Sequence, residues 1–385
     1  MVEVLGPRAL NRALLARQFL LERTTRSVPD VVEHLVGLQA QTPHSWYLGL
    51  WSRISGFRPE DAADRLVDRS LVRIAVMRST IHLVTAGDAH GLRPVVQPVL
   101  DRDLFTNQLH GKAIAGVDVA AVVEAARPLL AERPRTPKEL GALLQPTWPD
   151  RPAATLAYAV RNLLPLVQVP PRGVWGRSGP IAHTSAEAWL GAGSAYSPAT
   201  LVRRYLAAFG PASVQDVQTW SGLTRLREVV EPLRGELRVF HDDQGRELFD
   251  LPDAPRPDPD SPAPVRFLYD FDNLLLAHAD RRRTSTDVFR RAFAQRGGPT
   301  PGAVLVDGIT AAHWTLEQSR EEARVTVHLH HAVLSDVIDA ITDEAGRLLD
   351  FAAPGTVHEV RVLADTSPVS SATSTASGSP RCSTT

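Results

Sequence analysis

Two glutamines separated by one residue are the side chains whose spacing most suggests chemistry. Gln39 and Gln41 lie in the segment QAQTP, residues 39–43, directly after a predicted helix. In a helix they would point about 200° apart, but Pro43 disfavours helical geometry and Gly37 weakens the helix before them. An extended segment would place both on one side, where two amides can hold one water molecule. The alternative is a pair of solvated glutamines that follow a helix.

Other polar clusters are weaker candidates for catalysis or metal binding. Asp270 and Asp272 in YDFDN would share one strand face, as paired catalytic carboxylates do, but solvated strand ends also carry such pairs. His328 and His330 in VTVHLHH would also share a strand face, but no third ligand is evident, so we interpret a half-exposed strand. The sequence has no phosphate-binding glycine loop, zinc-spaced Cys/His set or nucleophile-elbow serine. We therefore expect no metal ion and no cofactor.

The basic residues are almost all arginines, since only Lys112 and Lys138 of the 42 are lysines. A net charge of −1 excludes a protein coated with positive charge, but arginines gathered on one face would suit phosphate recognition. The alternative is codon bias in a GC-rich genome, and for a local cluster, a charged helix start. Five arginines gather in one stretch of the chain: Arg281, Arg282, Arg283, Arg290 and Arg291.

Three segments repeat one order of elements, namely a first helix, a short second helix, a third helix and then two strands around a tight turn. Their second helices begin with capping signals at Ser27, Thr136 and Ser213. In the first segment we expect helices over 10–23 and 27–39 and a hairpin over 71–85 that turns at Arg78-Ser79. In the second we expect helices over 117–133, 136–144 and 153–164 and a hairpin over 166–185. In the third we expect helices over 197–210, 213–223 and 224–233 and a hairpin over 237–251.

This order is that of the winged helix-turn-helix, so the predicted fold class is α+β with three tandem winged helices around a concave DNA channel. The alternatives are an α+β protein with unrelated hairpins, or winged helices that bind proteins rather than DNA. The units are expected over 1–95, 96–195 and 196–251. A proline-rich linker over 252–264 would precede a C-terminal α/β region over 265–365, and a disordered tail would cover 366–385.

The C-terminal region contains a strong hairpin signal. AVLVDGITAAHWTLE places Asp307-Gly308 between two apolar strands, a dipeptide typical of tight hairpin turns. The segment ARVTVHLHH predicts a further strand, and residues 334–352 predict a helix. The single cysteine, Cys382, lies in the tail, so we expect no disulfide bond.

The sequence resembles a known family at five places in the family's order: LNRALLARQ, VGLQAQ, VMRSTIHLV, FDNLLLAHADRRR and VLVDG. These strings are similar to those of the winged-helix DNA glycosylases related to AlkZ and YcaQ, a family that includes an antibiotic self-resistance enzyme. It extends over most of residues 8–365. The resemblance implies tandem winged helices around a DNA channel and the removal of N7-alkylated purines, including interstrand crosslinks.

The resemblance also assigns residues. Its Gln-x-Gln catalytic motif falls on Gln39 and Gln41. Its DNA-probing hairpin corresponds to Val304–Trp314, which makes the turn residues Asp307 and Gly308 candidate DNA contacts. The arginines at 281–283 become candidate phosphate ligands, and His278 in the HAD-R string either approaches DNA or caps a strand. A glutamine cannot protonate a leaving base, but an N7-alkylpurine is already cationic, so positioning water at C1′ is the chemistry that remains.

The resulting hypothesis is a monofunctional DNA glycosylase for bulky N7-alkylpurine adducts and crosslinks, with damaged double-stranded DNA as its partner. The alternative class is a winged-helix transcriptional regulator without catalysis, and a third possibility is a catalytically inactive scaffold. No apolar run approaches the roughly 18 residues of a membrane span, and the N-terminal residues lack a signal-peptide pattern. We therefore expect a cytoplasmic monomer that does not bind membranes.

Overall fold

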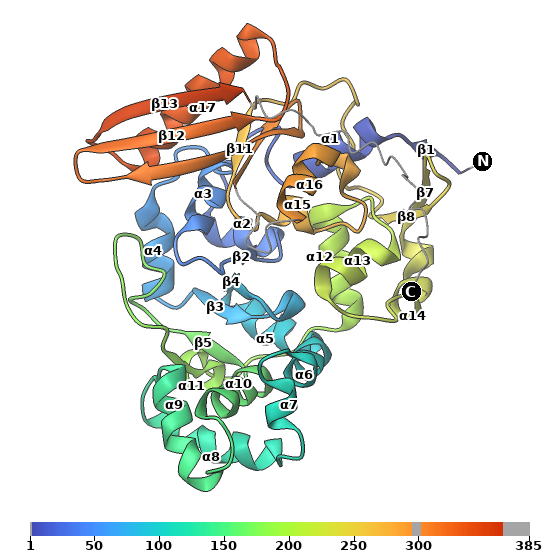
Figure 1. The fold of residues 1–385 in the computed structure, drawn as a ribbon. Helices are drawn as coiled ribbons and strands as arrows, with labels where there is room; N and C mark the ends of the chain where they lie inside the picture. Colours follow the sequence, from blue (N-terminus) through green and yellow to red (C-terminus); the bar gives the residue numbers. More distant parts are fainter. Residues whose placement is uncertain (1, 295–301, 365–385) are drawn as a thin grey trace, which may run out of the picture.

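The computed structural model describes residues 2–294 and 302–364, and within them the protein is a mixed α+β structure (Figure 1). The strands of this described part form three sheets. No helix in these two ranges combines the length and apolar character required to cross a membrane. The predicted tail over 366–385, with Cys382, lies outside the described residues.

The first segment forms the two predicted helices and the hairpin, but the helices end earlier than predicted, at Arg17 instead of residue 23 and at His34 instead of residue 39. Ser27 caps α2 by accepting a hydrogen bond from the Asp30 backbone N–H, as its position indicated. The hairpin turns at Arg78 and Ser79, which form a short 3-10 helix, η1, over Met77–Ser79. The elements are β1 Val4–Leu5, α1 Pro7–Arg17, α2 Val28–His34, β2 Leu38–Gln39, α3 Ser45–Trp51, α4 Pro59–Val67, β3 Leu71–Ala75 and β4 Ile81–Thr85.

The second segment is preceded by helices that the sequence analysis did not assign and then follows the predicted order. Thr136 caps α9 in a capping box with Glu139, as expected. The elements are α5 Ala86–Val95, α6 Gln97–Thr106, α7 Gly111–Ile114, α8 Val119–Glu132, α9 Pro137–Leu144, α10 Ala153–Leu163, β5 Leu166–Gln168, β6 His183–Ser185 and α11 Ala186–Leu190. Helices α8, α9 and α10 bury their own apolar cluster, which forms the lower lobe in Figure 1.

The third segment also follows the predicted order, although its third helix is short and continues as a 3-10 turn, η3, over Glu231–Glu236. Ser213 caps α13 in a capping box with Asp216. The elements are α12 Pro198–Phe209, α13 Val214–Ser221, α14 Arg227–Val230, β7 Arg238–Asp242 and β8 Glu247–Asp250.

The hairpins of the first two segments pair with each other. Strand β3 bonds to β5 as well as β4, which produces one five-stranded sheet in the order β2-β4-β3-β5-β6. The third hairpin pairs instead with β1 in a separate sheet, β1-β7-β8. Backbone pairing therefore joins the first two segments, a long-range contact that no local pattern indicated.

The C-terminal region forms the third sheet, in the order β13-β12-β11-β10-β9, and α17 packs against β9, β12 and β13. The Asp307-Gly308 turn between β10 and β11 is present as predicted. Strand β13 was not predicted, and it pairs in parallel with β12. The elements are β9 Arg266–Leu268, α15 Asn273–Leu276, η4 Arg281–Arg283, α16 Asp287–Ala294, β10 Gly302–Val306, β11 Ile309–Gln318, β12 Glu322–Leu329, α17 Ser335–Ala352 and β13 Val357–Ala364.

The main hydrophobic core joins parts of the chain that are distant in sequence. It contains side chains of α2, α3, β3, β4, α12, α13 and the C-terminal sheet. The residues after β9 are thereby held against the first segment, next to the Gln-x-Gln stretch.

Candidate functional site

Only the first part of the Gln-x-Gln segment is extended as predicted, because β2 ends at Gln39 and the chain bends at Gln41 and Thr42. Gly37 adopts φ +90° after α2, and a Cβ there would lie 2.8 Å from the Leu83 carbonyl oxygen, so this close turn favours glycine. Gln39 then pairs with His82 of β4, and the Ala40 N–H donates to the Ile81 carbonyl at 2.7 Å. The chain therefore runs alongside the start of β4.

Both glutamine side chains bond to the connection between β3 and β4. The Gln39 Oε1 atom accepts a hydrogen bond from Arg78 Nη2 at 2.8 Å, and Gln41 Oε1 accepts from the Ile81 N–H at 3.3 Å. Gln39 is 4% exposed, whereas Gln41 is open to solvent. The two amide oxygens therefore bond to residues 78 and 81, at the turn and at the first residue of β4. Each oxygen retains one further acceptor position.

The sequence analysis placed Arg78 in the turn between two apolar strands but did not identify it as a residue of the site. Its φ of 55° lies in the left-handed region, which costs energy for a residue with a side chain. Its guanidinium donates to the Trp220 carbonyl oxygen at 2.5 Å as well as to Gln39. Burial, followed by the positive charge of nearby Arg281, lowers the pKa of Arg78 to about 10. Arg78 remains charged at neutral pH and fixes the orientation of the Gln39 amide.

His82, the strand partner of Gln39, is not suited to acid–base catalysis near pH 7. Burial, followed by the charge of Arg78, lowers its pKa to about 3. Its Nδ1 atom contacts the Thr80 carbonyl oxygen at 3.0 Å, and the ring is completely buried. The imidazole is therefore a neutral part of the wall behind Gln39.

The two carboxylates of YDFDN have separate environments, which corrects the expectation that they share a strand face. Strand β9 ends at Leu268, before either residue. Asp272 is buried, caps α15 and forms a bidentate ion pair with buried Arg53 at 2.8 and 2.9 Å. Asp270 instead reaches the glutamine segment, where it accepts a 2.5 Å hydrogen bond from the Thr42 hydroxyl.

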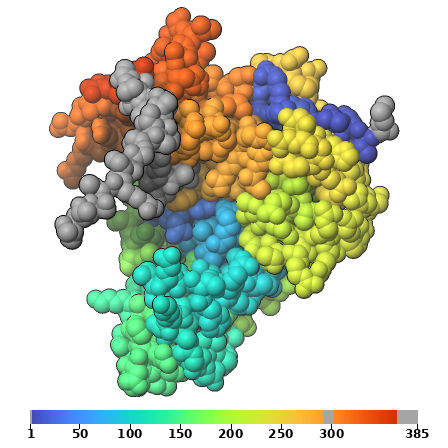
Figure 2. Space-filling model, turned by 45° about the vertical axis from the view of Figure 1, so that its right-hand side comes forward, coloured from blue at the N-terminus to red at the C-terminus, as the bar shows by residue number. Residues whose placement is uncertain are grey.

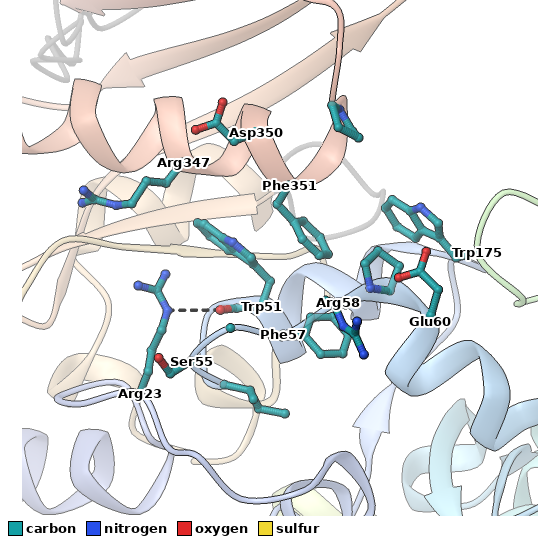
Figure 3. Close-up of a pocket in the computed structure, with 14 residues that line it drawn as sticks. Arg23, Trp51, Ser55, Phe57, Arg58, Glu60, Trp175, Arg347, Asp350 and Phe351 are labelled. Atoms are coloured by element: carbon teal, nitrogen blue, oxygen red, sulfur yellow. Dashed lines mark hydrogen bonds between the residues drawn. The ribbon is translucent and has the colours of Figure 1, made fainter.

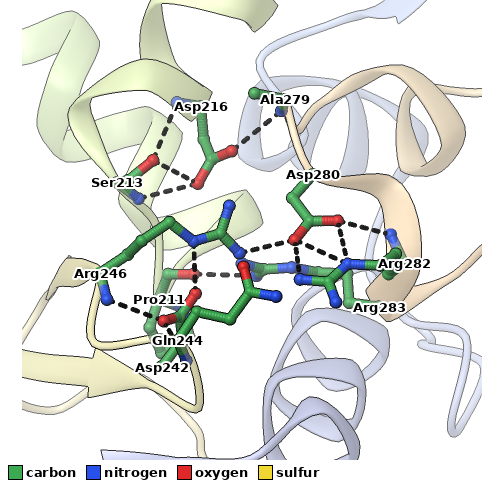
Figure 4. Close-up of polar contacts among 10 residues, drawn as sticks. All are labelled: Pro211, Ser213, Asp216, Asp242, Gln244, Arg246, Ala279, Asp280, Arg282 and Arg283. Carbon is green, nitrogen blue, oxygen red and sulfur yellow. Dashed lines mark hydrogen bonds and ion pairs between the residues drawn. The ribbon is translucent and has the colours of Figure 1, made fainter.

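The arginine cluster also divides into different environments. Arg282 is neutralised by Asp280, with contacts of 3.0 and 2.6 Å, and Asp280 also binds Arg246 of the third hairpin (Figure 4). Arg283 is buried and donates to the Pro211 carbonyl oxygen at 2.9 Å. The exposed side chain of Arg281 forms no hydrogen bond or ion pair with residues of the described part of the chain. Arg281 is thus the member of 281–283 that is available to a ligand near Arg78.

His278 lies in the interior rather than on the surface. Its Nε2 atom contacts the Phe209 carbonyl oxygen at 3.0 Å, and the side chain is 2% exposed. Burial, followed by the charge of Arg283, lowers its pKa to about 3. Of the two interpretations left open by the sequence, this placement favours the structural one.

The hairpin turn at Asp307-Gly308 packs against α1. Asp307 forms ion pairs with Arg8 and Arg12, and the Gly308 carbonyl oxygen accepts from Asn11 at 2.9 Å. A Cβ at Gly308 would lie 2.5 Å from Asn11 Oδ1. In this conformation Gly308 is buried against α1, while Asp307 is exposed and paired with two arginines of that helix.

A separate cavity of about 550 Å³ lies between the first segment, the loop between β5 and β6, and α17 (Figure 3). Its aromatic lining comprises Trp51, Phe57, Trp175 and Phe351. Neither glutamine contributes to it. Within residues 2–294 and 302–364, no three histidine, cysteine or carboxylate side chains are arranged to hold a metal ion.

Comparisons with known proteins agree with this architecture. A family model described as "DNA glycosylase AlkZ-like" matches residues 32–351. The solved structure of Streptomyces sahachiroi DNA glycosylase AlkZ superposes with a TM-score of 0.75 at 22% identity, covering 94% of this chain and 100% of that one. None of the curated proteins compared with the chain matches it. The structural similarity extends over nearly the whole fold.

Proposed function

The chain belongs to the AlkZ-like DNA glycosylase family, and from this membership we propose that it hydrolyses the N-glycosidic bond of N7-alkylated purines in double-stranded DNA. The proposed substrates include bulky adducts and interstrand crosslinks. We further propose that the activity serves DNA repair, or self-resistance to a DNA-alkylating antibiotic.

The observation that carries this proposal is the arrangement of Gln39 and Gln41. Their amide oxygens accept hydrogen bonds from Arg78 and Ile81, three residues apart, which fixes the two amides near the end of the β3–β4 connection. Two fixed amides beside each other can bind one water molecule through their free N–H groups and remaining acceptor positions. Water held near C1′ in this way would attack without a large entropic cost.

The departing base explains why the site needs no acidic side chain to protonate it. Alkylation at N7 makes the purine cationic, so departure produces a neutral base without protonation. A neutral base such as uracil departs as an anion unless an acid protonates it. Neither an amide nor His82, whose pKa burial lowers to about 3, would provide that proton near pH 7. The site therefore favours activated purines.

The shape of the molecule supports a DNA duplex as the substrate. In Figure 2 part of the first segment, seen as blue atoms near the centre, lies in a hollow between the lower lobe and the third and C-terminal regions. We propose that this hollow is the concave channel formed by three winged-helix units, and that the protein acts as a monomer. Arg281 would contact a phosphate beside the glutamines, since guanidinium groups bind phosphate oxygens well.

The test is a panel of defined duplexes under single-turnover conditions, with abasic sites measured after alkaline cleavage. The panel contains N7-methylguanine, a bulky N7 adduct, an N7–N7 crosslink, uracil and hypoxanthine. We expect release of the three N7-alkylated substrates and none of the neutral bases. Efficient uracil release, or failure on every bulky N7 substrate, would contradict the proposed specificity. Binding to DNA without any abasic sites would instead support a non-catalytic regulator.

A further inference from the structure

We propose that Asp270 is a third catalytic residue of this site, which accepts the proton of the attacking water and faces the developing positive charge at C1′. The inference rests on the proposed function, because it adds a base to the same glutamine pair. It concerns a carboxylate that lies 228 residues from Thr42 in the sequence and contacts it directly in the structure.

The geometry places residues 269–270 alongside the glutamine segment. The Tyr269 hydroxyl donates to the Gln39 carbonyl oxygen at 3.0 Å, and the Thr42 hydroxyl donates to Asp270 Oδ2 at 2.5 Å. Burial, followed by the negative charge of Asp272, raises the pKa of Tyr269, so its hydroxyl remains a donor at neutral pH. These two bonds bracket Gln41. Asp270 is half-buried, and its Oδ1 atom forms no hydrogen bond with the described residues.

The positive charges near the glutamines favour a carboxylate in this site. Arg78 is bonded to Gln39, and Arg281 lies close enough for its charge to lower the pKa of Arg78. Both amide oxygens already accept a hydrogen bond, which reduces the negative charge they can offer to a cationic sugar. A carboxylate aligned with C1′ would supply the electrostatic stabilisation that the amides cannot. Asp272 is not available for this role, because Arg53 neutralises it in the interior.

The proton balance of hydrolysis gives a second argument. Water oxygen forms a bond to C1′ while the C1′–N9 bond breaks, and that electron pair neutralises the alkylated purine. The attacking water must then lose one proton. Glutamine amides do not accept protons near pH 7, and His82 is enclosed with a lowered pKa. Asp270 Oδ1 can take the proton and later release it to solvent, while Thr42 holds Oδ2 in place.

The charged and titratable groups around this site are Arg78, Arg281, the Arg53–Asp272 pair and the Tyr269 hydroxyl. The first test therefore compares Asp270→Asn with Asp253→Asn, an exposed aspartate in the proline-rich linker, using full-length protein and an N7-methylguanine duplex. We expect the single-turnover rate to fall by roughly 10²-fold or more in Asp270→Asn and not in the control.

Chemical rescue separates a base from a structural residue. We expect formate to restore part of the activity of Asp270→Ala, because the small carboxylate can occupy the space left by the side chain. Thr42→Val, which retains the shape of threonine, should lower the rate with little change in DNA affinity. If Asp270→Asn stays within a few fold of the wild type, or if formate fails to restore any activity of Asp270→Ala, the inference is wrong. An inactive wild-type protein would instead contradict the proposed function itself.

Discussion

At the scale of single residues, the site depends on how two ordinary amides are fixed. Gln39 is enclosed between Arg78 and Tyr269, whereas Gln41 remains open to solvent beside Thr42. The buried glutamine is suited to orientation, and the exposed one is suited to contact with water and substrate. The two residues are therefore not equivalent, although their sequence positions are symmetric around Ala40.

We expect Gln39→Ala and Gln41→Ala each to lower the single-turnover excision rate by roughly 10²-fold or more, the scale of losing one fixed electrostatic stabiliser. Gln39→Ala should also reduce thermal stability, because it leaves the buried Arg78 guanidinium with one partner fewer. Gln145→Ala, an exposed position in the lower lobe, serves as the matched control. Near-normal excision by both variants would show that the water is positioned elsewhere.

At the scale of elements, the contact between α1 and the β10–β11 turn is specific. Arg8, Asn11 and Arg12 on α1 all bond to Asp307 or Gly308. This contact attaches the N-terminal helix to the C-terminal sheet. A hairpin that enters DNA would first have to break these bonds, or another connection would have to enter the groove.

We expect Gly308→Ala to destabilise the protein by about 1–3 kcal/mol, since φ is +81° and the new Cβ would meet Asn11 Oδ1 at 2.5 Å. Gly346→Ala in α17 is the matched control, because no atom lies within 4 Å of the added carbon. That change should be neutral or stabilise by about 0.5–1 kcal/mol. Urea unfolding monitored by circular dichroism measures both. Equal stability of the two variants would contradict the packed turn.

At the scale of the whole molecule, the arrangement of charge determines which arginines can reach DNA. The net charge is −1, and most of the arginines discussed above are paired with carboxylates or buried. Binding to a duplex must therefore use a small number of unpaired cations inside the hollow rather than a broad basic surface. Arg281 is one such cation.

We expect Arg281→Ala to weaken DNA binding and to reduce the slope of log K against log salt by about 1, the value for losing one phosphate contact. Arg282→Ala should have a smaller effect, because Asp280 already neutralises that side chain. Fluorescence anisotropy with an undamaged duplex at several salt concentrations measures this. An unchanged slope for Arg281→Ala would remove this residue from the interface.

Acid should destabilise the whole molecule through its buried histidines. Burial is the main cause that lowers the pKa of both His82 and His278 to about 3, below the unfolded value near 6.5. Between these values the unfolded chain binds more protons, so stability is complete above about pH 6.5 and declines as pH falls. We expect roughly 1–2 kcal/mol per histidine between pH 7.5 and 5, and a shallower decline in His278→Gln. Urea midpoints across this range test the prediction.

The sequence by itself determined the local features of this protein. The capping residues Ser27, Thr136 and Ser213 and the Asp307-Gly308 turn were all predicted from the sequence. Each depends on interactions within a few residues, whose geometry is set by backbone sterics and side-chain capping. Family motifs added the DNA glycosylase class, which the family match confirms.

Only the tertiary structure decided which polar residues meet. Asp270 and Asp272 are two residues apart, yet one contacts Thr42 and the other pairs with Arg53. Arg281, Arg282 and Arg283 are adjacent, yet among the described residues Arg281 has no hydrogen-bond or ion-pair partner, Arg282 is neutralised by Asp280, and Arg283 is buried. The pairing of β3 with β5 likewise joins two predicted segments. These outcomes depend on packing between distant segments, and burial and partner choice are set by that packing rather than by sequence spacing.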